Sequence, residues 1–369
     1  MQESRAIVAM AAVGAAVLLL AVTPLSAEYT IDQLVDDAGL REGSIAMRNA
    51  SSWDPSRVVL VRDIGFELPD FDGFNVVVVS SLEEALTQAG SAGAIVGFCN
   101  DELLEAAPHA SWVQIYSAGA DRCVTSPKFV GGEVALTNMQ KMSAPVIAEH
   151  AIAMTLALLR KLPAFMEDRK SGEWNRSEPY TRGMTTAHGK TMLVLGLGGI
   201  GTEIARRGSA LGMRVIATRN SSREGPDFVD YVGLSDEILT LAQEADVIVN
   251  ALPLTDKTRG LLGEEFFAAV AQARAPYFIN VGRGATVDTD ALLAALQDGR
   301  LAGAGLDVTD PEPLPKEHGL WQADNVIITP HVSGRGSDLN RRRLLVIENI
   351  RRYLAGDALL NVVDAGRGY

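Results

Sequence analysis

Three polar residues in the second half of the chain have the chemistry needed to reduce a keto group next to a carboxylate. They are Arg283, Glu312 and His331, and each follows a short apolar run that is typical of a strand. The reduction needs a cation to hold the carboxylate, a proton donor for the forming alkoxide, and a carboxylate that orients the donor. Arginine, histidine and glutamate suit these three roles in that order.

Each residue also has a simpler interpretation. Arg283, between two glycines, could cap a turn, Glu312 could be a solvated loop charge, and His331 could be a structural histidine. Because all three lie past strand ends, where doubly wound sheets place ligands, we favour a catalytic set. The sequence has no HExxH motif and no paired CxxC motifs, so we expect no metal site.

A hydride donor for this set is indicated by the run Gly196-Leu197-Gly198-Gly199-Ile200-Gly201, between an apolar segment and a helix-like segment. Backbone N–H groups of such a turn approach a pyrophosphate, and the helix N-terminus adds partial positive charge. Among 35 glycines the motif alone is weak, but strands and helices alternate after it. We therefore expect a dinucleotide site at Gly196, Gly198, Gly199, Ile200 and Gly201. The alternative is a doubly wound sheet that binds no nucleotide.

The end of the second strand after this turn predicts which dinucleotide is bound. About 20 residues after the turn, NAD-binding sequences have an acidic residue that accepts hydrogen bonds from the ribose hydroxyls. This chain has Arg219 there, followed by Asn220, Ser221, Ser222 and Arg223 as further donors. Since a guanidinium pairs with phosphate through two hydrogen bonds, we expect NADP(H), with NAD(H) as the second choice. The alternative is a solvated arginine at a strand end.

The elements that position these residues predict a two-lobed α/β fold. Near-continuous apolar runs predict six strands of a doubly wound, parallel Rossmann sheet, at 192–195, 213–218, 246–250, 276–281, 303–308 and 325–328. A smaller, flavodoxin-like α/β lobe has predicted strands at 58–61, 75–79, 94–98, 112–116 and 134–137. A helix over 340–354 would return the chain to that lobe. We assign 56–144 and 335–369 to a discontinuous substrate domain, and 145–334, with a connector helix, to the dinucleotide-binding domain.

Composition and charge limit the expected partners. The chain has 369 residues, is 47% hydrophobic and carries a net charge of −13, which suits a two-domain enzyme and argues against a nucleic-acid partner. Its two cysteines are Cys99 and Cys123. So few in so long a chain form no disulfide framework and do not indicate a compartment. We expect a small-molecule 2-oxo or 2-hydroxy acid as substrate, and a homodimer.

The amino terminus has the features of a signal peptide. Arg5 precedes an apolar run at 7–22, and Leu25-Ser26-Ala27 then offers a cleavage site before Glu28. The run is shorter than the ~20 residues that span a bilayer. We therefore expect residues 1–27 to export the chain or to tether it to a membrane. A core helix, or a cytoplasmic protein with a misplaced start codon, are the alternatives.

Ordered motifs from about residue 112 to the end resemble the D-isomer-specific 2-hydroxyacid dehydrogenases. They are Ser117-Ala118-Gly119-Ala120-Asp121, Leu136-Thr137-Asn138, Ala148-Glu149-His150, Gly189-Lys190-Thr191, Leu252-Pro253-Leu254-Thr255, Asn280-Val281-Gly282-Arg283-Gly284, Leu306-Asp307-Val308 and Thr329-Pro330-His331. The resemblance implies hydride transfer between NAD(P)(H) and a 2-oxo acid. It implies that Arg283 binds the substrate carboxylate, His331 is the acid/base and Glu312 orients it.

The resemblance also implies contacts around these three residues. Asp307 would hold the nicotinamide carboxamide, and Val281 would lie near its ring. Pro253 and Thr258 would line the cofactor site, the backbone at Ala118 and Gly119 would grip the substrate carboxylate, and substrate size would depend on Phe98, Cys99, Asn100 and Met139.

Two features of the sequence differ from the usual pattern of this family. Arg219, in place of the usual acid, resembles NADPH-preferring members such as glyoxylate/hydroxypyruvate reductases, whereas the amino-terminal apolar run is not part of the family pattern. Formate and phosphite dehydrogenases share the scaffold and stay open as alternatives. A non-catalytic, dinucleotide-sensing binding protein is the alternative from another class. The intact set of Arg283, Glu312 and His331 argues against it.

Overall fold

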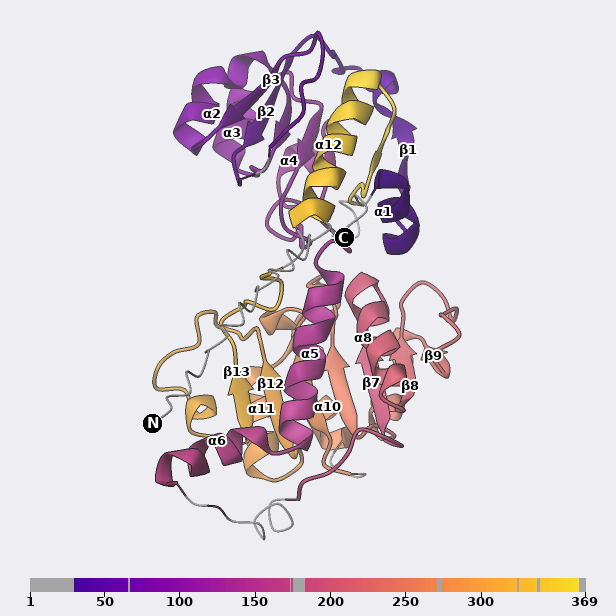
Figure 1. Cartoon of the computed structure of the whole chain (residues 1–369), viewed down its shortest axis with the longest axis vertical. Helices are drawn as coiled ribbons and strands as arrows, with labels where there is room; N and C mark the ends of the chain where they lie inside the picture. Colours follow the sequence, from indigo (N-terminus) through magenta and orange to yellow (C-terminus); the bar gives the residue numbers. More distant parts are fainter. Residues whose placement is uncertain are drawn as a thin grey trace, which may run out of the picture.

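The chain folds into two α/β lobes, joined where α5 and α12 begin (Figure 1). The computed structural model describes residues 30–65, 67–172, 174, 183–270, 274–323, 325–336 and 339–364. The expected leader, residues 1–27, lies outside these described residues. Within them, no helix is both long enough and apolar enough to cross a membrane.

The large lobe contains a parallel sheet of seven strands in the order β13-β12-β11-β10-β7-β8-β9. Reading outward in both directions from β7, this is the Rossmann order with one further strand at the β13 edge. The strands are β7 (Thr191–Leu195), β8 (Arg214–Thr218), β9 (Tyr231–Gly233), β10 (Val247–Asn250), β11 (Tyr277–Asn280), β12 (Gly303–Leu306) and β13 (Val326–Ile328). The six expected strands are present, and the expectation of only six is wrong. The missed strand, β9, has three residues and is too short for an apolar run.

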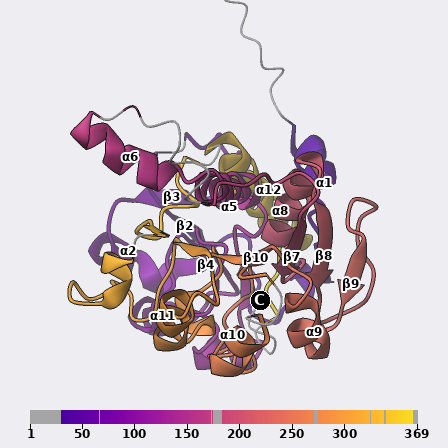
Figure 2. The same ribbon diagram turned by 90° about the horizontal axis from the view of Figure 1, so that it is seen from below.

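Helices cover both faces of this sheet (Figures 1 and 2). Side chains of alternate strand residues pack on α5 and α8 on one face, and on α9, α10 and α11 on the other. This two-sided burial explains why the strands are continuously apolar. Asp288 caps α11 by accepting hydrogen bonds from the N–H groups of Asp290 and Ala291. The helices of the lobe are α5 (Ala144–Leu159), α6 (Leu162–Ser171), α8 (Gly199–Ala210), α9 (Ile238–Ala242), α10 (Glu264–Val270) and α11 (Thr289–Gln297).

The small lobe has a five-stranded parallel sheet in the order β3-β2-β4-β5-β6, which is the flavodoxin-like order. The strands are β2 (Val58–Arg62), β3 (Val76–Val79), β4 (Ala92–Val96), β5 (Trp112–Gln114) and β6 (Ala135–Thr137). One face packs on α2 (Leu82–Gln88), α3 (Asp101–Ala106) and α4 (Pro127–Val130), and the other on α1 (Ile31–Ala38) and α12 (Leu339–Ala355). Short 3-10 turns are η1 (Met47–Asn49), η2 (Ala89–Ser91), η3 (Ser235–Glu237), η4 (Gly284–Thr286) and η5 (Gly319–Gln322).

The two ends of the described chain meet on the small lobe. Strands β1 (Glu42–Ala46) and β14 (Ala358–Leu360) pair antiparallel, and Leu34, Leu40 and Met47 are buried against side chains of α12. Residues 31–49, which the sequence assigned to neither domain, therefore pack on the small lobe. This lobe is built from two separate stretches of chain.

Candidate active site

The guanidinium of Arg283, just after β11, lies where the two lobes meet. Its Nε and Nη2 both lie 3.3 Å from Oδ1 of Asp121, which follows β5 of the small lobe. Its Nη1 donates to the carbonyl of Gly282 at 2.9 Å. About a third of each side chain is exposed, 29% for Arg283 and 33% for Asp121. The two-donor edge of Arg283 thus already faces a carboxylate, which is the group it is expected to bind in a substrate.

The loop that was expected to grip the substrate carboxylate lies directly against this arginine. A Cβ at Gly119 would lie 1.6 Å from Nη2 of Arg283, so a side chain at this position would displace the guanidinium. The carbonyl of Ala118 accepts a hydrogen bond of 2.7 Å from Nδ2 of Asn138, and Ser117 Oγ donates to the carbonyl of Gly119. These bonds hold the loop of Ala118 and Gly119 beside Arg283, and its contact with a substrate carboxylate stays a prediction.

His331 and Glu312 form the expected pair. Nδ1 of His331 lies 2.8 Å from Oε1 of Glu312, and about half of each side chain is exposed, 49% and 45%. Because Nδ1 faces the glutamate, Nε2 is the ring nitrogen that is left to meet a substrate. The backbone at His331 has φ +53, in the left-handed region that residues other than glycine rarely adopt. Such conformations concentrate at functional sites, where surrounding contacts must hold them.

Those contacts come from Asp307, which follows β12 and has a fully buried carboxylate. The carboxylate accepts hydrogen bonds from Thr329 Oγ1 at 2.7 Å and from the N–H groups of Val332 at 2.9 Å and Ser333 at 3.0 Å. Burial alone would raise the pKa of Asp307, but the hydrogen bonds from Ser333, Thr329 and Val332 outweigh it and lower this pKa. Asp307 therefore holds the loop that carries His331.

The glycine-rich turn leads from β7 into α8. Gly196 has φ +92, and a Cβ at Gly201 would lie 2.0 Å from the carbonyl oxygen of Gly196. Glycine is therefore required at both positions, by the turn and by the close approach of helix to strand. A Cβ at Gly198 would meet nothing within 4 Å, so the turn borders open space at the start of α8. The partly buried Ile200 lies in the first turn of that helix.

Arg219 follows β8, as expected, and its side chain is partly exposed. Its Nη1 donates to the carbonyl of Glu224 at 2.9 Å, and Asn220 beside it is exposed. Arg223, expected as a further donor, instead forms an ion pair of 2.8 Å with Glu237 and a hydrogen bond with Tyr231. Glu237 lies 14 positions beyond Arg223, on the other side of β9. Their ion pair therefore depends on the position of β9, which the local sequence does not predict.

Comparison with known proteins agrees with this arrangement. The family model for "D-isomer specific 2-hydroxyacid dehydrogenase, NAD binding domain" matches residues 152–333. The chain is 34% identical to the human glyoxylate reductase/hydroxypyruvate reductase over 325 residues, which are 82% of this chain and 92% of the human protein. This chain belongs to the D-isomer-specific 2-hydroxyacid dehydrogenase family. It is therefore a nicotinamide-dependent oxidoreductase, which decides against the non-catalytic alternative.

Other relatives of this dehydrogenase agree. A glyoxylate reductase of Thermofilum pendens is 28% identical over 86% of this chain and 88% of that protein. Among solved structures, the NADPH-dependent glyoxylate/hydroxypyruvate reductase of Sinorhizobium meliloti, in complex with NADP and sulfate, has a TM-score of 0.71 and 27% identity. The match covers 85% of this chain and 100% of that one. A Xanthobacter autotrophicus dehydrogenase in complex with NADPH and MES has a TM-score of 0.70, the same identity and the same coverage.

The remaining expected cofactor residues of the dehydrogenase lie near the carboxyl ends of β10 and β11. Thr258 Oγ1 donates to the carbonyl of Pro253 at 2.7 Å, which closes the loop after β10. Val281 is buried in the core at the end of β11. The contacts of Pro253, Thr258, Val281 and Asp307 with a nicotinamide stay predictions.

Two buried asparagines also shape the site: Asn280, from the motif that contains Arg283, and Asn250, which the sequence did not single out. Nδ2 of Asn250 donates to Oδ1 of Asn280 at 3.0 Å and to Oγ1 of Thr286 at 2.8 Å. Oδ1 of Asn280 accepts from the N–H of Gly282, and Thr286 Oγ1 donates to the carbonyl of Arg283. This buried network fixes the turn that carries Arg283. The signal was present, since a polar residue ending a continuously apolar strand needs a buried partner.

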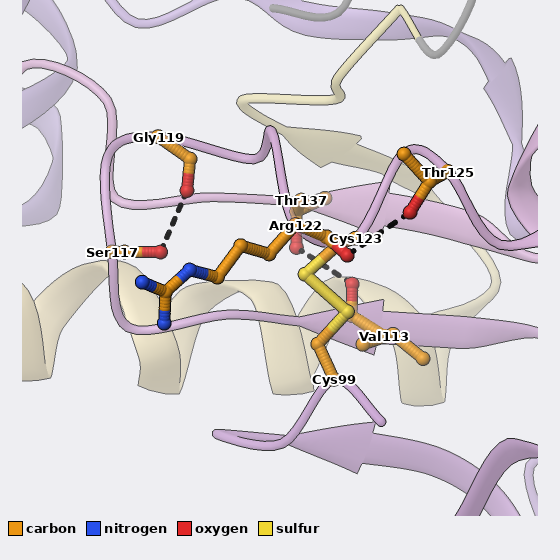
Figure 3. The surroundings of a disulfide bond; sticks show 8 residues. All are labelled: Cys99, Val113, Ser117, Gly119, Arg122, Cys123, Thr125 and Thr137. Atoms are coloured by element: carbon orange, nitrogen blue, oxygen red, sulfur yellow. Dashed lines mark hydrogen bonds between the residues drawn. A yellow bond between two sulfur atoms is a disulfide. The ribbon is translucent and has the colours of Figure 1, made fainter. Parts of the chain in front are cut away.

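Cys99, expected near the substrate, is joined to Cys123 by a disulfide (Figure 3). The bond connects the loop after β4 to the segment that follows Ser117 and Gly119, with a Cα–Cα distance of 5.9 Å. The sequence predicted no disulfide framework from two cysteines in so long a chain, whereas the structure joins the two in a single bond. They are 24 positions apart, and only the packing of the loops after β4 and β5 brings them together. Direct contact of Cys99 with substrate stays a prediction.

Proposed function

We propose that this dehydrogenase reduces a small 2-oxo acid of the glyoxylate or hydroxypyruvate type with NADPH. The observation that carries the proposal is the placement of Arg283 at the lobe junction together with the His331–Glu312 contact of 2.8 Å. The names of its relatives in humans, Thermofilum pendens and Sinorhizobium meliloti support the same substrate class.

The residues of the chain fit a bound dinucleotide, and each of them has a separate role in the reaction. The cofactor, held at the glycine-rich turn, supplies the hydride. Arg283 binds the substrate carboxylate through its two-donor edge, which requires it to exchange Asp121 for the substrate. Nε2 of His331 donates a proton to the carbonyl oxygen as negative charge develops there. Glu312 orients the ring through Nδ1 and stabilises the imidazolium from which the proton leaves.

The choice of NADPH over NADH rests on Arg219. Its position after β8 is the one from which an acidic residue would contact the ribose hydroxyls. Among the ion pairs of the described residues, none involves Arg219, so its charge is available for a 2′-phosphate. The NADP and NADPH in the Sinorhizobium meliloti and Xanthobacter autotrophicus structures agree with this choice.

The test is the loss of NADPH absorbance with a panel of 2-oxo acids, run alongside NADH. We expect turnover with glyoxylate and hydroxypyruvate, and weaker turnover with bulkier acids. The reverse assay, with NADP⁺ and either formate or phosphite, covers the dehydrogenases that share the scaffold. Turnover only in that assay would refute the proposed substrate class.

We also propose that residues 1–27 direct the chain out of the cytoplasm, by cleavage near Glu28 or as a membrane tether. The Cys99–Cys123 disulfide supports this, because such bonds persist in oxidising compartments. Amino-terminal sequencing and fractionation of protein from the native host test it. Soluble cytoplasmic protein that retains Met1 would contradict both forms of the proposal.

Finally, we propose that the chain works as a homodimer in which α6 takes part. Figure 2 shows this helix projecting from the body of the large lobe, and it has no buried residue. It exposes Leu162 and Met166 to solvent, and Trp174 just beyond it is 89% exposed. Apolar side chains grouped in this way are typical of an interface. Light scattering of the wild type and of Met166→Glu tests this, and a wild-type monomer would contradict it.

A further inference from the structure

Lys141, a residue of the small lobe, lies against the glycine-rich turn of the large lobe. It lies between β6 and α5, where the chain passes from the small lobe to the large one. A Cβ at Gly199 would lie 2.8 Å from Cγ and 3.6 Å from Cα of Lys141. Gly199 does not have a positive φ, so its backbone would accept another residue. It is the lysine side chain that occupies the space beside the first residue of α8.

The backbone holds Lys141 in an unfavourable conformation. Its φ is +72, in the left-handed region, which is strained for a residue with a side chain. Two hydrogen bonds fix the loop at the residue before Lys141: the N–H of Gln140 donates to Oδ1 of Asn138, and Nδ2 of Asn361 donates to the carbonyl of Gln140. The fold therefore maintains this lysine over the turn at an energetic cost, although glycine would fit the backbone without strain.

The charge of Lys141 has no carboxylate partner among the ion pairs of the described residues. Its ammonium donates to the carbonyl of Gly39 at the end of α1, which leaves two of its three donors for other groups. Burial, followed by the positive charges of Arg41 and Arg219, lowers the pKa of Lys141. The positive charges of Lys141, Arg41 and Arg219 thus lie near enough to repel one another, in a chain whose net charge is −13. An anion placed among them would relieve their repulsion.

We propose that Lys141 binds the pyrophosphate of the cofactor from the small-lobe side, opposite the backbone N–H groups of the glycine-rich turn. The inference rests on the proposed function. It assigns distinct phosphates to two cations: the pyrophosphate, which NADPH and NADH share, to Lys141, and the 2′-phosphate to Arg219. Because Lys141 belongs to the substrate lobe, this contact also links cofactor binding to the position of that lobe.

The test is the Kd of NADPH and of NADH, measured from the fluorescence of the bound reduced nicotinamide with the full chain. Lys141→Met should weaken both cofactors by about tenfold, as expected for one charge-assisted hydrogen bond, and the loss should shrink at high salt. Lys141→Arg should restore most of the affinity. Gly199→Ala should also weaken both, because its Cβ displaces the lysine. Lys128→Met, which removes a lysine from α4 of the same lobe, is the matched control and should change neither Kd.

Three results would overturn the inference. Unchanged Kd values in a folded Lys141→Met variant, with only a lower Tm, would show that Lys141 merely caps α1 through Gly39. A loss confined to NADPH would place Lys141 on the 2′-phosphate, the role assigned to Arg219. A wild-type chain that binds neither cofactor would refute the proposed function, and this inference with it.

Discussion

Asp121→Asn tests whether Asp121 competes with the substrate for Arg283. The substitution keeps the shape of the side chain and removes the charge that faces Nε and Nη2 at 3.3 Å. Both side chains are about one-third exposed, and ion pairs that water reaches in this way contribute about 0.2–1 kcal/mol. The substrate carboxylate must displace this interaction to bind. Its loss should therefore lower the KM for a 2-oxo acid by up to about fivefold.

Initial rates with NADPH over a range of glyoxylate concentrations measure this effect. We expect kcat to change little, because Arg283, Glu312 and His331 all remain. Arg283→Lys is the counterpart: it keeps a positive charge but loses the two-donor edge, so KM should rise strongly and kcat should fall. Neither variant should alter the Kd of NADPH. A raised KM in Asp121→Asn would refute the reasoning, since it would mean that Asp121 holds Arg283 in the pose that the substrate needs.

The other predictions concern the proton donor, the cofactor, the disulfide and the buried aspartate. His331→Ala should lower kcat by at least ~100-fold, as expected for loss of a general acid, with the Kd of NADPH unchanged. Arg219→Asp should remove a contact of about 1.5–3 kcal/mol and repel the 2′-phosphate, so that the ratio of kcat/KM for the two cofactors inverts in favour of NADH. Cys123→Ser should lower the free energy of unfolding by about 3.5 kcal/mol, the chain-entropy value for the 24-position separation, measured by denaturant titration. As the pH is lowered, the free energy of unfolding of Asp307→Asn should fall less than that of the wild type. The lowered pKa of Asp307 stabilises the fold above about pH 4, and this contribution is lost as the pH drops through the folded pKa.

Each of these has an outcome that contradicts it. Near-normal turnover of His331→Ala would assign the proton to another group, and a parent enzyme that prefers NADH would show that Arg219 points to solvent. Equal unfolding energies for Cys123→Ser and the wild type would mean that the bond does not restrain the unfolded chain. Identical acid unfolding of Asp307→Asn would show that the Asp307 carboxylate does not stabilise the folded state through its charge.

Much of the fold and the main functional residues could be predicted from the sequence because their signals are local. The parallel strands other than β9 are short apolar runs, the turn at Gly196 and Gly201 needs glycine within a few residues of a strand end, and Asp288 lies at the start of its helix. Arg283 and His331 are recognisable because each directly follows a strand. Periodicity, turn chemistry and capping act over about ten residues, so they can be read from the chain without knowing its path.

Only the tertiary structure decided which partners the functional residues contact. Asp121 and Arg283 are separated by 162 positions, and their contact forms only because the two lobes meet along their strand ends. The position of Lys141 over Gly199, the pairing of Cys99 with Cys123 and the role of Asp307 in holding His331 likewise join segments that lie in different loops. None of these contacts has a periodic or local signature. They arise from the packing of side chains between elements, where the geometry depends on the whole fold rather than on the neighbouring residues.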